Sequence, residues 1–374
     1  MNKNRTFDFS PLAVVRDGKP LAANGRRGLA SLVATLLAVV LAAAACSGSP
    51  SSSTSASAKS HDAAIPVTMS IPTYAANFGP YLAAVDKGYY AQQGLNVSIT
   101  KLSGESSVAG LLSGSVQFAG AAGSAVPAIL SGQPVVNISV NTDSPPYLIV
   151  AKTSINNLAG LKGQKLGIQT LGDSIQVSTN ELLEKNGITP SSVDEIPIGL
   201  EPAPLTALEN GAVPAAVFAA PQLSALDKTS DASQFHVIGR MEGNVYLPIA
   251  GTTVSRAFLT SHASEVREFL YATAEGAKYF LDHPSYAISL LAKDGDGTTA
   301  NATADYDYCG VWPLSGGVSL TQQEQAIDEF ASANHLHAGS PSKVYDFKIA
   351  NSVYAQVFGK QSSGTVTKNT LPTS

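Results

Sequence analysis

Apolar and polar positions alternate in several short stretches of this chain, and apolar positions at helical spacing follow most of them. Residues 67–71 alternate as VTMSI, which predicts a half-buried strand. Apolar side chains then recur on one helix face from Phe78 to Tyr89, with Pro80 suited to the first turn. Further strands are predicted at 95–99, 116–119 and 135–140, and a helix at 124–130. This alternation predicts parallel βα units with helices on both faces of the sheet.

The same order of elements returns after residue 152. Strands are predicted at 165–168, 195–198, 215–218 and 236–238, and helices at 174–186 and 205–210. The motif Leu111-x-x-Gly114-x-Val116 is echoed by Leu208-x-x-Gly211-x-Val213, and each copy leads into a strand of small residues. This repeat predicts two lobes of like topology.

An uncharged run at 29–45 follows Arg26-Arg27 and ends in small residues before Cys46. A charged segment, an apolar segment and small residues before a cleavage point are typical of a secretory signal. With cysteine after the cleavage point, the pattern resembles a bacterial lipobox, in which the cysteine is acylated and becomes the new N-terminus. The lipobox favours Leu where this chain has Ala43. The alternative is an uncleaved signal anchor, and the arginine pair leaves the general and twin-arginine export routes both open.

The residues after Cys46 are almost all Ser, Ala, Thr, Gly or Pro up to residue 60, a composition that favours a flexible stalk. We therefore expect a signal peptide at 1–45, and a lipidated cysteine with its stalk at 46–65. The protein would then be exported and anchored to the outer face of the cytoplasmic membrane, at the cell surface or in the periplasm.

Composition excludes several classes of function. The net charge is −5 with 14% charged residues, and no run of Lys and Arg suits a nucleic-acid backbone. Lipid on Cys46 leaves Cys309 without an intramolecular partner, so we interpret it as a small buried apolar residue. Enzyme motifs with a serine elbow, a zinc-binding His pair, a phosphate loop or paired cysteines are absent from the sequence. His335-x-His337 lacks further zinc ligands. We expect no catalytic residues, no metal and no cofactor.

Three segments of the body carry a family resemblance: 80–99 (PYLAAVDKGYYAQQGLNVSI), 111–135 (LLSGSVQFAGAAGSAVPAILSGQPV) and 158–188 (LAGLKGQKLGIQTLGDSIQVSTNELLEKNGI). They resemble the solute-binding proteins of nitrate, sulfonate and taurine importers, a group that also includes thiamine-precursor binding proteins. The resemblance implies an α/β fold of the two-lobed type II periplasmic-binding-protein class, with ligand held between the lobes.

The resemblance also implies how the chain is divided. Two crossover strands are expected at 146–152 and 246–253, so that lobe 1 comprises 66–145 and 254–374 and lobe 2 comprises 146–253. The C-terminal helices would complete lobe 1, and 342–358 is predicted as one helical segment.

Three loops precede helices at the carboxyl ends of predicted strands, where ligands of α/β sheets bind and helix N-termini present free N–H groups. Their candidate residues are Tyr74, Asn77, Phe78, Gly120, Ser124, Thr170, Gly172, Asp173 and Ser174. Each has an ordinary structural alternative: Asp173 or Ser174 caps its helix, Gly120 permits tight packing, and Tyr74 and Phe78 belong to the core. The resemblance adds Phe218 and Pro221 on the wall of lobe 2, and Asn244 and Tyr246 at the hinge.

None of these loops contains Lys or Arg, which favours a small neutral or zwitterionic organic ligand unless Lys101 or Arg240 reaches the site. The resemblance implies a monomeric, extracytoplasmic substrate-binding protein of an ABC importer. It would capture a small organic solute and deliver it to a permease driven by its ATPase. Two alternatives stay open: a tethered sensor that presents its ligand to a receptor, and an enzyme related to thiamine-precursor synthesis.

Overall fold

The computed structural model describes residues 64–367 apart from 121, 200–201, 223–225, 227–231 and 296–297. The described residues belong to one compact unit. The predicted signal peptide, Cys46 and the stalk up to residue 63 lie outside the described residues. Within them, no helix has both the length and the apolar character needed to cross a membrane.

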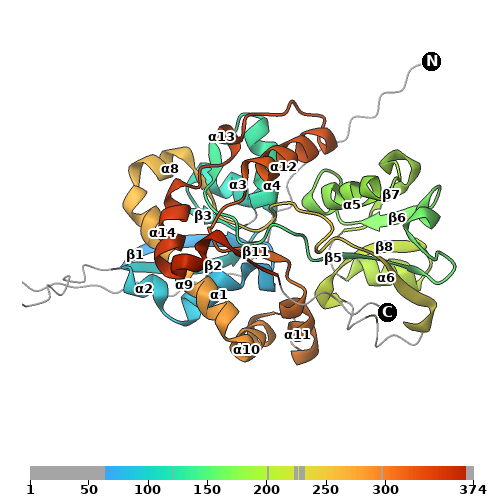
Figure 1. The fold of residues 1–374 in the computed structure, drawn as a ribbon, viewed down its shortest axis with the longest axis horizontal. Helices are drawn as coiled ribbons and strands as arrows, with labels where there is room; N and C mark the ends of the chain where they lie inside the picture. Colours follow the sequence, from blue (N-terminus) through green and yellow to red (C-terminus); the bar gives the residue numbers. More distant parts are fainter. Residues whose placement is uncertain are drawn as a thin grey trace, which may run out of the picture. The chain divides into compact units, whose positions relative to one another are not determined.

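The first sheet has five strands in the order β2-β1-β3-β10-β4. Its strands are β1 (Ile65–Ile71), β2 (Leu95–Lys101), β3 (Phe118–Ala119), β4 (Val135–Asn137) and β10 (Thr253–Ser255). β1 pairs in parallel with β2 and β3, whereas β10 is antiparallel to β3 and β4. The helical segments between these strands are η1 (Ala76–Phe78), α1 (Gly79–Asp86), α2 (Tyr89–Gln92), α3 (Gly104–Ser113) and α4 (Ala122–Leu130). This sheet and the helices that cover it form the first lobe (Figure 1).

The second sheet repeats this arrangement in the order β7-β6-β8-β5-β9. Its strands are β5 (Tyr147–Lys152), β6 (Lys165–Ile168), β7 (Asp194–Pro197), β8 (Ala215–Ala219) and β9 (Phe235–Arg240). The segments between them include η2 (Leu158–Leu161), α5 (Ser174–Lys185), η3 (Pro190–Ser192), α6 (Ala203–Glu209), η4 (Ala220–Gln222) and η5 (Ala232–Gln234). The second lobe is this sheet with its helices, drawn in green and yellow in Figure 1.

The two lobes share one topology position by position. The fourth strand of each sheet, β10 in the first lobe and β5 in the second, is antiparallel to its neighbours and is the strand whose chain arrives from the other lobe. The predicted parallel pairing holds within the βα units, and these two strands depart from it. A chain that crosses between the lobes enters each sheet at the edge where the parallel strands end, so it must run back against them.

The crossover positions are correspondingly refined. The predicted strand at 146–152 is β5, but the predicted strand at 246–253 contributes only its last residue to β10. The chain passes between the two sheets at 138–146 and 241–252, and we call these two segments the hinge connections. Part of the apolar stretch 246–250 packs against the start of α4, where the Gly123 N–H donates to the Ile249 carbonyl at 3.1 Å, whereas Tyr246 at its beginning is 40% exposed.

The sequence repeat marks structurally equivalent turns. Gly114 follows α3 with φ +77° and Gly211 follows α6 with φ +73°. Only glycine adopts this left-handed conformation without a steric cost, and it is the usual way to end a helix. Both turns lead into the third strand of a sheet, β3 or β8, so the shared motif reflects the shared topology.

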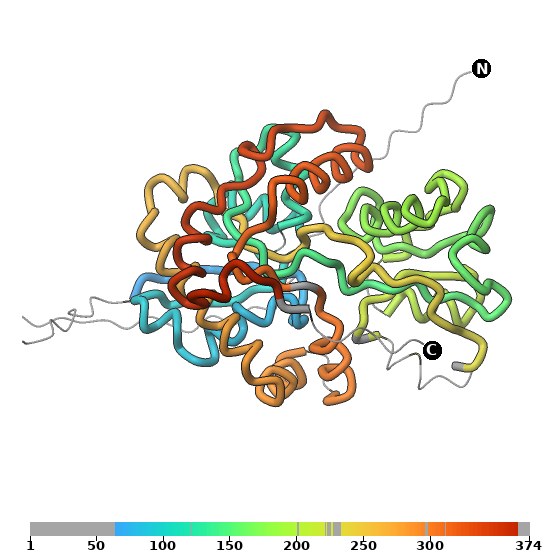
Figure 2. Tube along the Cα trace, in the orientation of Figure 1, coloured from blue at the N-terminus to red at the C-terminus, as the bar shows by residue number. Residues whose placement is uncertain are grey.

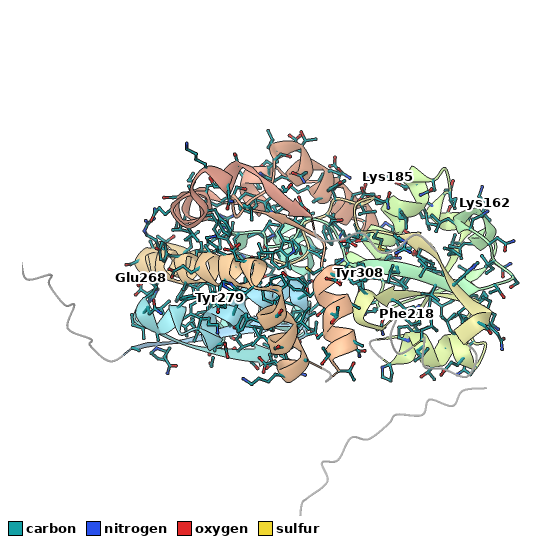
Figure 3. All side chains as sticks on the ribbon, turned by 60° about the horizontal axis from the view of Figure 1, so that its bottom comes forward. Lys162, Lys185, Phe218, Glu268, Tyr279 and Tyr308 are labelled. Carbon is teal, nitrogen blue, oxygen red and sulfur yellow. The ribbon has the colours of Figure 1, made fainter. Side chains whose placement is uncertain are left out.

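The C-terminal part of the chain completes the first lobe, as Figure 2 shows by the orange and red segments beside the blue ones. Its elements are α8 (Arg256–Ser261), α9 (Ala263–Asp282), α10 (Pro284–Asp294), α11 (Thr299–Asp307), β11 (Val311–Pro313), α12 (Leu320–Ala333), α13 (Pro341–Val344), α14 (Lys348–Phe358), η6 (Gly359–Ser363) and β12 (Thr365–Thr367). Figure 3 labels Glu268 and Tyr279 on the long helix α9. The opposite face of α9 is apolar and packs on the core of the first lobe.

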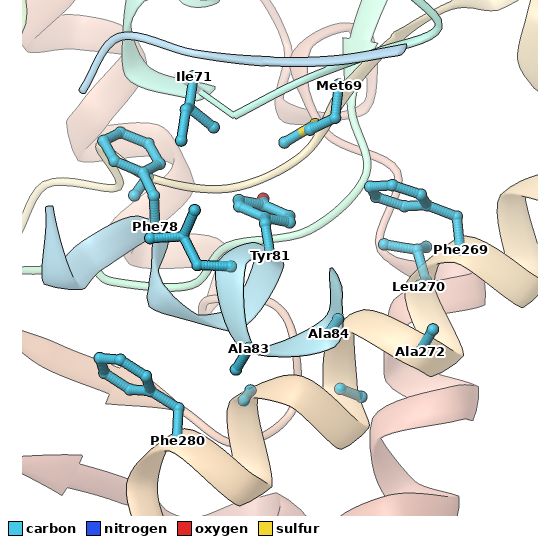
Figure 4. Close-up of a cluster of buried hydrophobic side chains, with 14 of the residues drawn as sticks. Met69, Ile71, Phe78, Tyr81, Ala83, Ala84, Phe269, Leu270, Ala272 and Phe280 are labelled. Carbon is cyan, nitrogen blue, oxygen red and sulfur yellow. The ribbon is translucent and has the colours of Figure 1, made fainter. Parts of the chain in front are cut away.

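Aromatic stacking ties α9 to the first sheet. The Phe269 ring lies 3.7 Å from the Phe118 ring and 4.9 Å from the Tyr90 ring, centroid to centroid. Phe269 lies in the same buried cluster as Met69 and Tyr81 (Figure 4). Because a buried aromatic ring stabilises a fold by several kcal/mol relative to its truncation, the first lobe depends on a helix more than a hundred residues away in sequence.

The predicted helix at 342–358 is wrong in its middle. It is broken into α13 and α14, because Tyr345 forms a parallel bridge with Asn137 at the edge of the first sheet. The Asp346 N–H donates to the Asn137 carbonyl at 2.9 Å, and Tyr345 is 4% exposed. Pairing with the sheet edge outweighs the local helical pattern.

Candidate functional site

Two helix N-termini meet at the edge of the first sheet where its parallel strands end. Gly104 begins α3 and Ser124 lies in the first turn of α4. A Cβ atom on Gly104 would lie 2.2 Å from the Ser124 Cβ, so only glycine allows this approach. The end of β1 holds both loops: the Ile71 carbonyl accepts from Leu102 N and the Ser70 carbonyl from Gly120 N. The positive ends of two helix dipoles therefore act near one point.

Lys101 brings a positive charge to the same edge. It is the exposed last residue of β2, and its Nζ lies 5.2 Å from the centroid of the Tyr74 ring. Tyr74 is half-buried in the loop after β1. Lys101 is one of the two basic residues that the sequence offers to the ligand site from outside the candidate loops, and the parallel pairing of β1 with β2 places it beside Tyr74.

Three first-lobe candidates are buried. Phe78 is 4% exposed and belongs to the core cluster with Ile71 and Tyr81, where Figure 4 labels all three. Asn77 is 7% exposed. Gly120 is buried against Ile71, because a Cβ there would meet the Ile71 Cγ2 at 2.8 Å. Phe78 and Gly120 therefore lie in the surroundings that their structural alternatives predicted, which are the core for Phe78 and tight packing for Gly120.

On the second lobe, the loop 170–174 begins α5. Asp173 is the N-cap: its Oδ1 accepts from the N–H groups of Ile175 and Gln176, both at 2.9 Å. Ser174 is therefore the first helical residue. Its side chain is half-buried, and its hydroxyl does not cap the helix. Burial raises the pKa of Asp173 to about 6, against the stabilisation that its backbone donors give the carboxylate. Thr170 is exposed at the start of this loop.

The Gly172 loop touches the first lobe. The Asn334 side chain, at the end of α12, donates from Nδ2 to the Gly172 carbonyl at 3.0 Å. Gly172 has φ +79°, and a Cβ there would lie 2.5 Å from the Asn334 Oδ1. This contact brings the start of α5 against an element of the first lobe.

Phe218 and Pro221 lie on and after β8. Phe218 is fully buried among Val150, Leu208 and Leu226 in the core of the second lobe, and Figure 3 labels it there. Pro221 lies in η4, and its side chain is outside the described residues. On the same side of the lobe, Tyr308 packs against Leu148 and Ala220.

Asn244 and Tyr246 lie on the second hinge connection, away from both loop groups. The Asn244 carbonyl accepts from Lys185 Nζ at 2.9 Å, and the same Nζ lies 6.0 Å from the Tyr246 ring centroid. Tyr246 is 40% exposed. Figure 3 labels Lys185, the last residue of α5. The family resemblance named these two residues as hinge-side ligand contacts, and both lie on the segment that joins the two sheets.

Polar hinge residues were missed from the sequence. Ser144 joins the two hinge connections, donating from Oγ to the Val245 carbonyl at 2.8 Å and accepting from Gly243 N at 3.0 Å. Asp143 Oδ2 accepts from Gln322 Nε2 at 2.9 Å. The sequence feature that could have identified them is the polar run Asn141-Thr142-Asp143-Ser144 just before the first crossover. In the structure, each of these four residues is at most 3% exposed. Polar side chains in such a buried segment need partners from another part of the chain.

Helix α12 of the first lobe also packs on α5 of the second through carboxylates. Glu181 on α5 is 2% exposed, and its Oε1 accepts from Lys185 Nζ at 2.7 Å and Gln325 Nε2 at 2.6 Å. Glu329, one turn beyond Gln325, lies close enough to Glu181 and Glu184 for their charges to act on it. Burial, and then these two charges, raise the pKa of Glu329 to about 7.

We expect Glu329→Gln to stabilise the protein at pH 8 and to have little effect at pH 4. A carboxyl whose pKa rises from 4.5 to about 7 on folding makes the folded state lose stability as pH rises through that window, and glutamine removes this loss. After allowance for solvent screening, the gain at pH 8 is of order 1 kcal/mol. Thermal melting at both pH values measures it. Glu324→Gln, at an exposed position of the same helix, is the control, and equal effects of the two changes would contradict the assignment.

Within the described ranges, no group of three or more His, Cys, Asp or Glu side chains is arranged to hold a metal ion. Cys309 is fully buried, and its Sγ accepts from Trp312 Nε1 at 3.2 Å. That environment agrees with its interpretation as a small interior residue.

Comparisons with known proteins agree with this architecture. A family model described as NMT1/THI5 like matches residues 75–287. No curated protein matches the chain.

Several solved structures share the fold. The periplasmic aliphatic sulphonate-binding protein of Escherichia coli superposes with a TM-score of 0.62 and 16% identity, covering 77% of this chain and 93% of that one. The alkanesulfonate-binding protein of Xanthomonas axonopodis pv. citri, bound to MOPS, gives 0.59 and 16% identity over 76% and 99%. The periplasmic nitrate-binding protein of Synechocystis PCC 6803 gives 0.59 and 13% over 79% and 89%. The predicted two-lobed type II periplasmic-binding-protein fold is confirmed.

Proposed function

The chain belongs to the NMT1/THI5-like family, and from that membership and its fold we propose that it is the extracytoplasmic substrate-binding protein of an ABC importer. It captures a small organic solute between its lobes and delivers it to a membrane permease with its ATPase. It acts as a binding protein and not as an enzyme. It works as a monomer, tethered to the outer face of the cytoplasmic membrane by lipid on Cys46.

The observation that carries the proposal is the pair of helix N-termini at Gly104 and Ser124. Their backbone N–H groups and dipoles favour an anionic group, and Lys101 adds a full positive charge beside Tyr74. These residues lie where the parallel strands of the first sheet end, which is the edge at which α/β proteins bind ligands.

On the second lobe, the loop 170–174 supplies the opposing surface. It presents the exposed Thr170 and the half-buried Ser174 at the start of α5. The Asp173 carboxylate is engaged by its helix and opposes a second negative charge on the ligand. We therefore propose a small organic solute with a single acidic group, whose remaining surface is neutral or carries one positive charge that makes the whole molecule zwitterionic. The sulphonate-binding and nitrate-binding proteins of like fold are described as taking anions.

A ligand held by both edges favours the closed arrangement of the lobes, with motion at the two hinge connections. The Ser144 hydrogen bonds keep these connections side by side, so they move as one hinge.

A thermal-shift screen tests the function. Amino acids, sulfonates, nitrate and aromatic acids are tested, and each organic acid is paired with its uncharged amide. A solute at a hundredfold excess over its dissociation constant adds about 2.7 kcal/mol of stability, so a saturable rise in melting temperature is expected for at least one acid and not for its amide. Solution scattering should show a more compact particle with that acid. A hit of equal strength with acid and amide would contradict the anionic assignment, and the absence of any hit would count against a solute-binding role.

A further inference from the structure

A cavity of about 490 Å³ lies at the hinge, away from the solute site proposed above. Asp143 and Tyr246 line it, one from each hinge connection. The other walls come from the C-terminal part of the first lobe and include Ser319, Gln322, Asn351 and Gly364. Its volume falls in the range of small-molecule pockets. The loops with Ser124 and Ser174 do not contribute to it.

Among the described residues, Asp143 is the only charged side chain that lines this cavity. It is 3% exposed. Its Oδ2 accepts from Gln322 Nε2, but its Oδ1 is buried without a hydrogen-bond partner among the described residues. A buried carboxylate oxygen left in this state costs free energy, so a donor that reached it from the cavity would remove that cost.

The remaining lining favours a cation over an anion. The cavity also borders the start of α12, whose positive end would attract an anion. However, a capping box already uses this end: Gln322 N donates to Ser319 Oγ at 3.3 Å, and Ser319 N donates to Gln322 Oε1 at 3.0 Å. What remains is one carboxylate, the Tyr246 ring, near which Lys185 Nζ already lies at 6.0 Å from the centroid, and neutral groups such as the Asn351 amide.

We propose that the hinge cavity binds a small organic cation through a primary ammonium or guanidinium group, with Asp143 Oδ1 as its acceptor. An N–H donor is required because, among the described residues, Oδ1 has neither a hydrogen-bond partner nor a salt-bridge partner. In the absence of the cation, burial raises the pKa of Asp143 to about 6, which agrees with a carboxylate that has no cationic partner. This site does not depend on the identity of the solute, nor on the proposed transport role.

Calorimetry with 1,4-diaminobutane tests the proposal, with 1,4-butanediol as the uncharged probe of the same length. The diamine should bind the wild-type protein saturably and the diol should not. Asp143→Asn keeps the shape of the side chain and its contact to Gln322 but removes the charge. It should lower the affinity for the diamine by about tenfold to a hundredfold. Diamine binding that is absent, or that is equal in Asp143→Asn, overturns the proposal.

A second variant guards against misfolding of the first. Asn351 is exposed, and Asn351→Lys places an ammonium at the cavity wall without disturbing the core. It should abolish diamine binding, whereas the neutral Asn351→Gln should retain it. Ser124→Trp should also retain it, because Ser124 lies outside this cavity. Loss of diamine binding in Ser124→Trp, or its retention in Asn351→Lys, would place the cation elsewhere and overturn the assignment.

Discussion

Ser124→Trp should reduce the affinity for the solute by more than about a hundredfold while the protein stays folded. The indole is too large for the space beside Gly104, so it would fill the region in front of the N-termini of α3 and α4. The solute would lose both the space and the N–H groups, and tight binding depends on such preformed polar contacts. Calorimetry with the acid found in the screen measures the loss, and thermal melting measures the fold.

The matched control is Ser131→Trp, an exposed position just beyond the other end of α4. It should leave solute affinity unchanged. An unchanged affinity in Ser124→Trp itself would show that the solute binds elsewhere, whatever the role of the fold.

Ser174→Trp tests the opposing edge in the same series. Because Asp173 and not Ser174 caps α5, the substitution leaves the cap in place, and the loss of about 0.5–2 kcal/mol expected for a missing cap should not appear. Ser191→Trp, at an exposed position of η3, is its control. A lower affinity for the solute in Ser174→Trp, with a normal melting temperature, would support contact between Ser174 and the ligand. A change in melting temperature alone would indicate a structural role.

Cys46→Ala should abolish attachment of the protein to the membrane. The small residues before Cys46 and the Ser-rich stretch after it predict that this thiol carries the lipid. A protein held only by acyl chains is released when the acylated residue is removed. Expression in a bacterial host with a labelled fatty acid should label the wild type and leave Cys46→Ala unlabelled and soluble.

Cys309→Ala is the natural control, since Cys309 is the other cysteine of the chain and is buried. It should be labelled like the wild type. Label on Cys46→Ala would show that another residue carries lipid. Membrane attachment of an unlabelled wild type would favour the uncleaved signal anchor.

The sequence by itself determined the class of fold and its repetition. The spacing of apolar residues in strands and helices is a local property, so the order of strands and helices could be predicted in both halves. The turn motif with Gly114 and Gly211 predicted that the two lobes have like topology, because a left-handed turn favours glycine in both copies. The start of α5 at Ser174 was predicted, whereas α4 begins at Ala122, two residues before the predicted start at Ser124.

Tertiary structure decided which residues of those loops face outward. The spacing of Phe78 and the position of Phe218 were compatible with a cleft wall, but each side chain lies in the core of its lobe. A local pattern gives the face of an element, whereas the partner of that face is set by elements distant in the chain. The choice between Asp173 and Ser174 as the cap was likewise left to geometry, since both residue types cap helices.

The hinge and its surroundings depend most on contacts that the sequence alone did not predict. The antiparallel direction of β5 and β10 follows from the edge at which a crossing chain enters a sheet, which no local pattern encodes. Tyr345 leaves the helical pattern because Asn137 offers a free strand edge. Asp143 is buried because Gln322 and the C-terminal segments close over it, 179 residues away in the case of Gln322. Polar and apolar periodicity fixes the elements, while burial, charge and contact at the hinge arise only when separate parts of the chain are brought together.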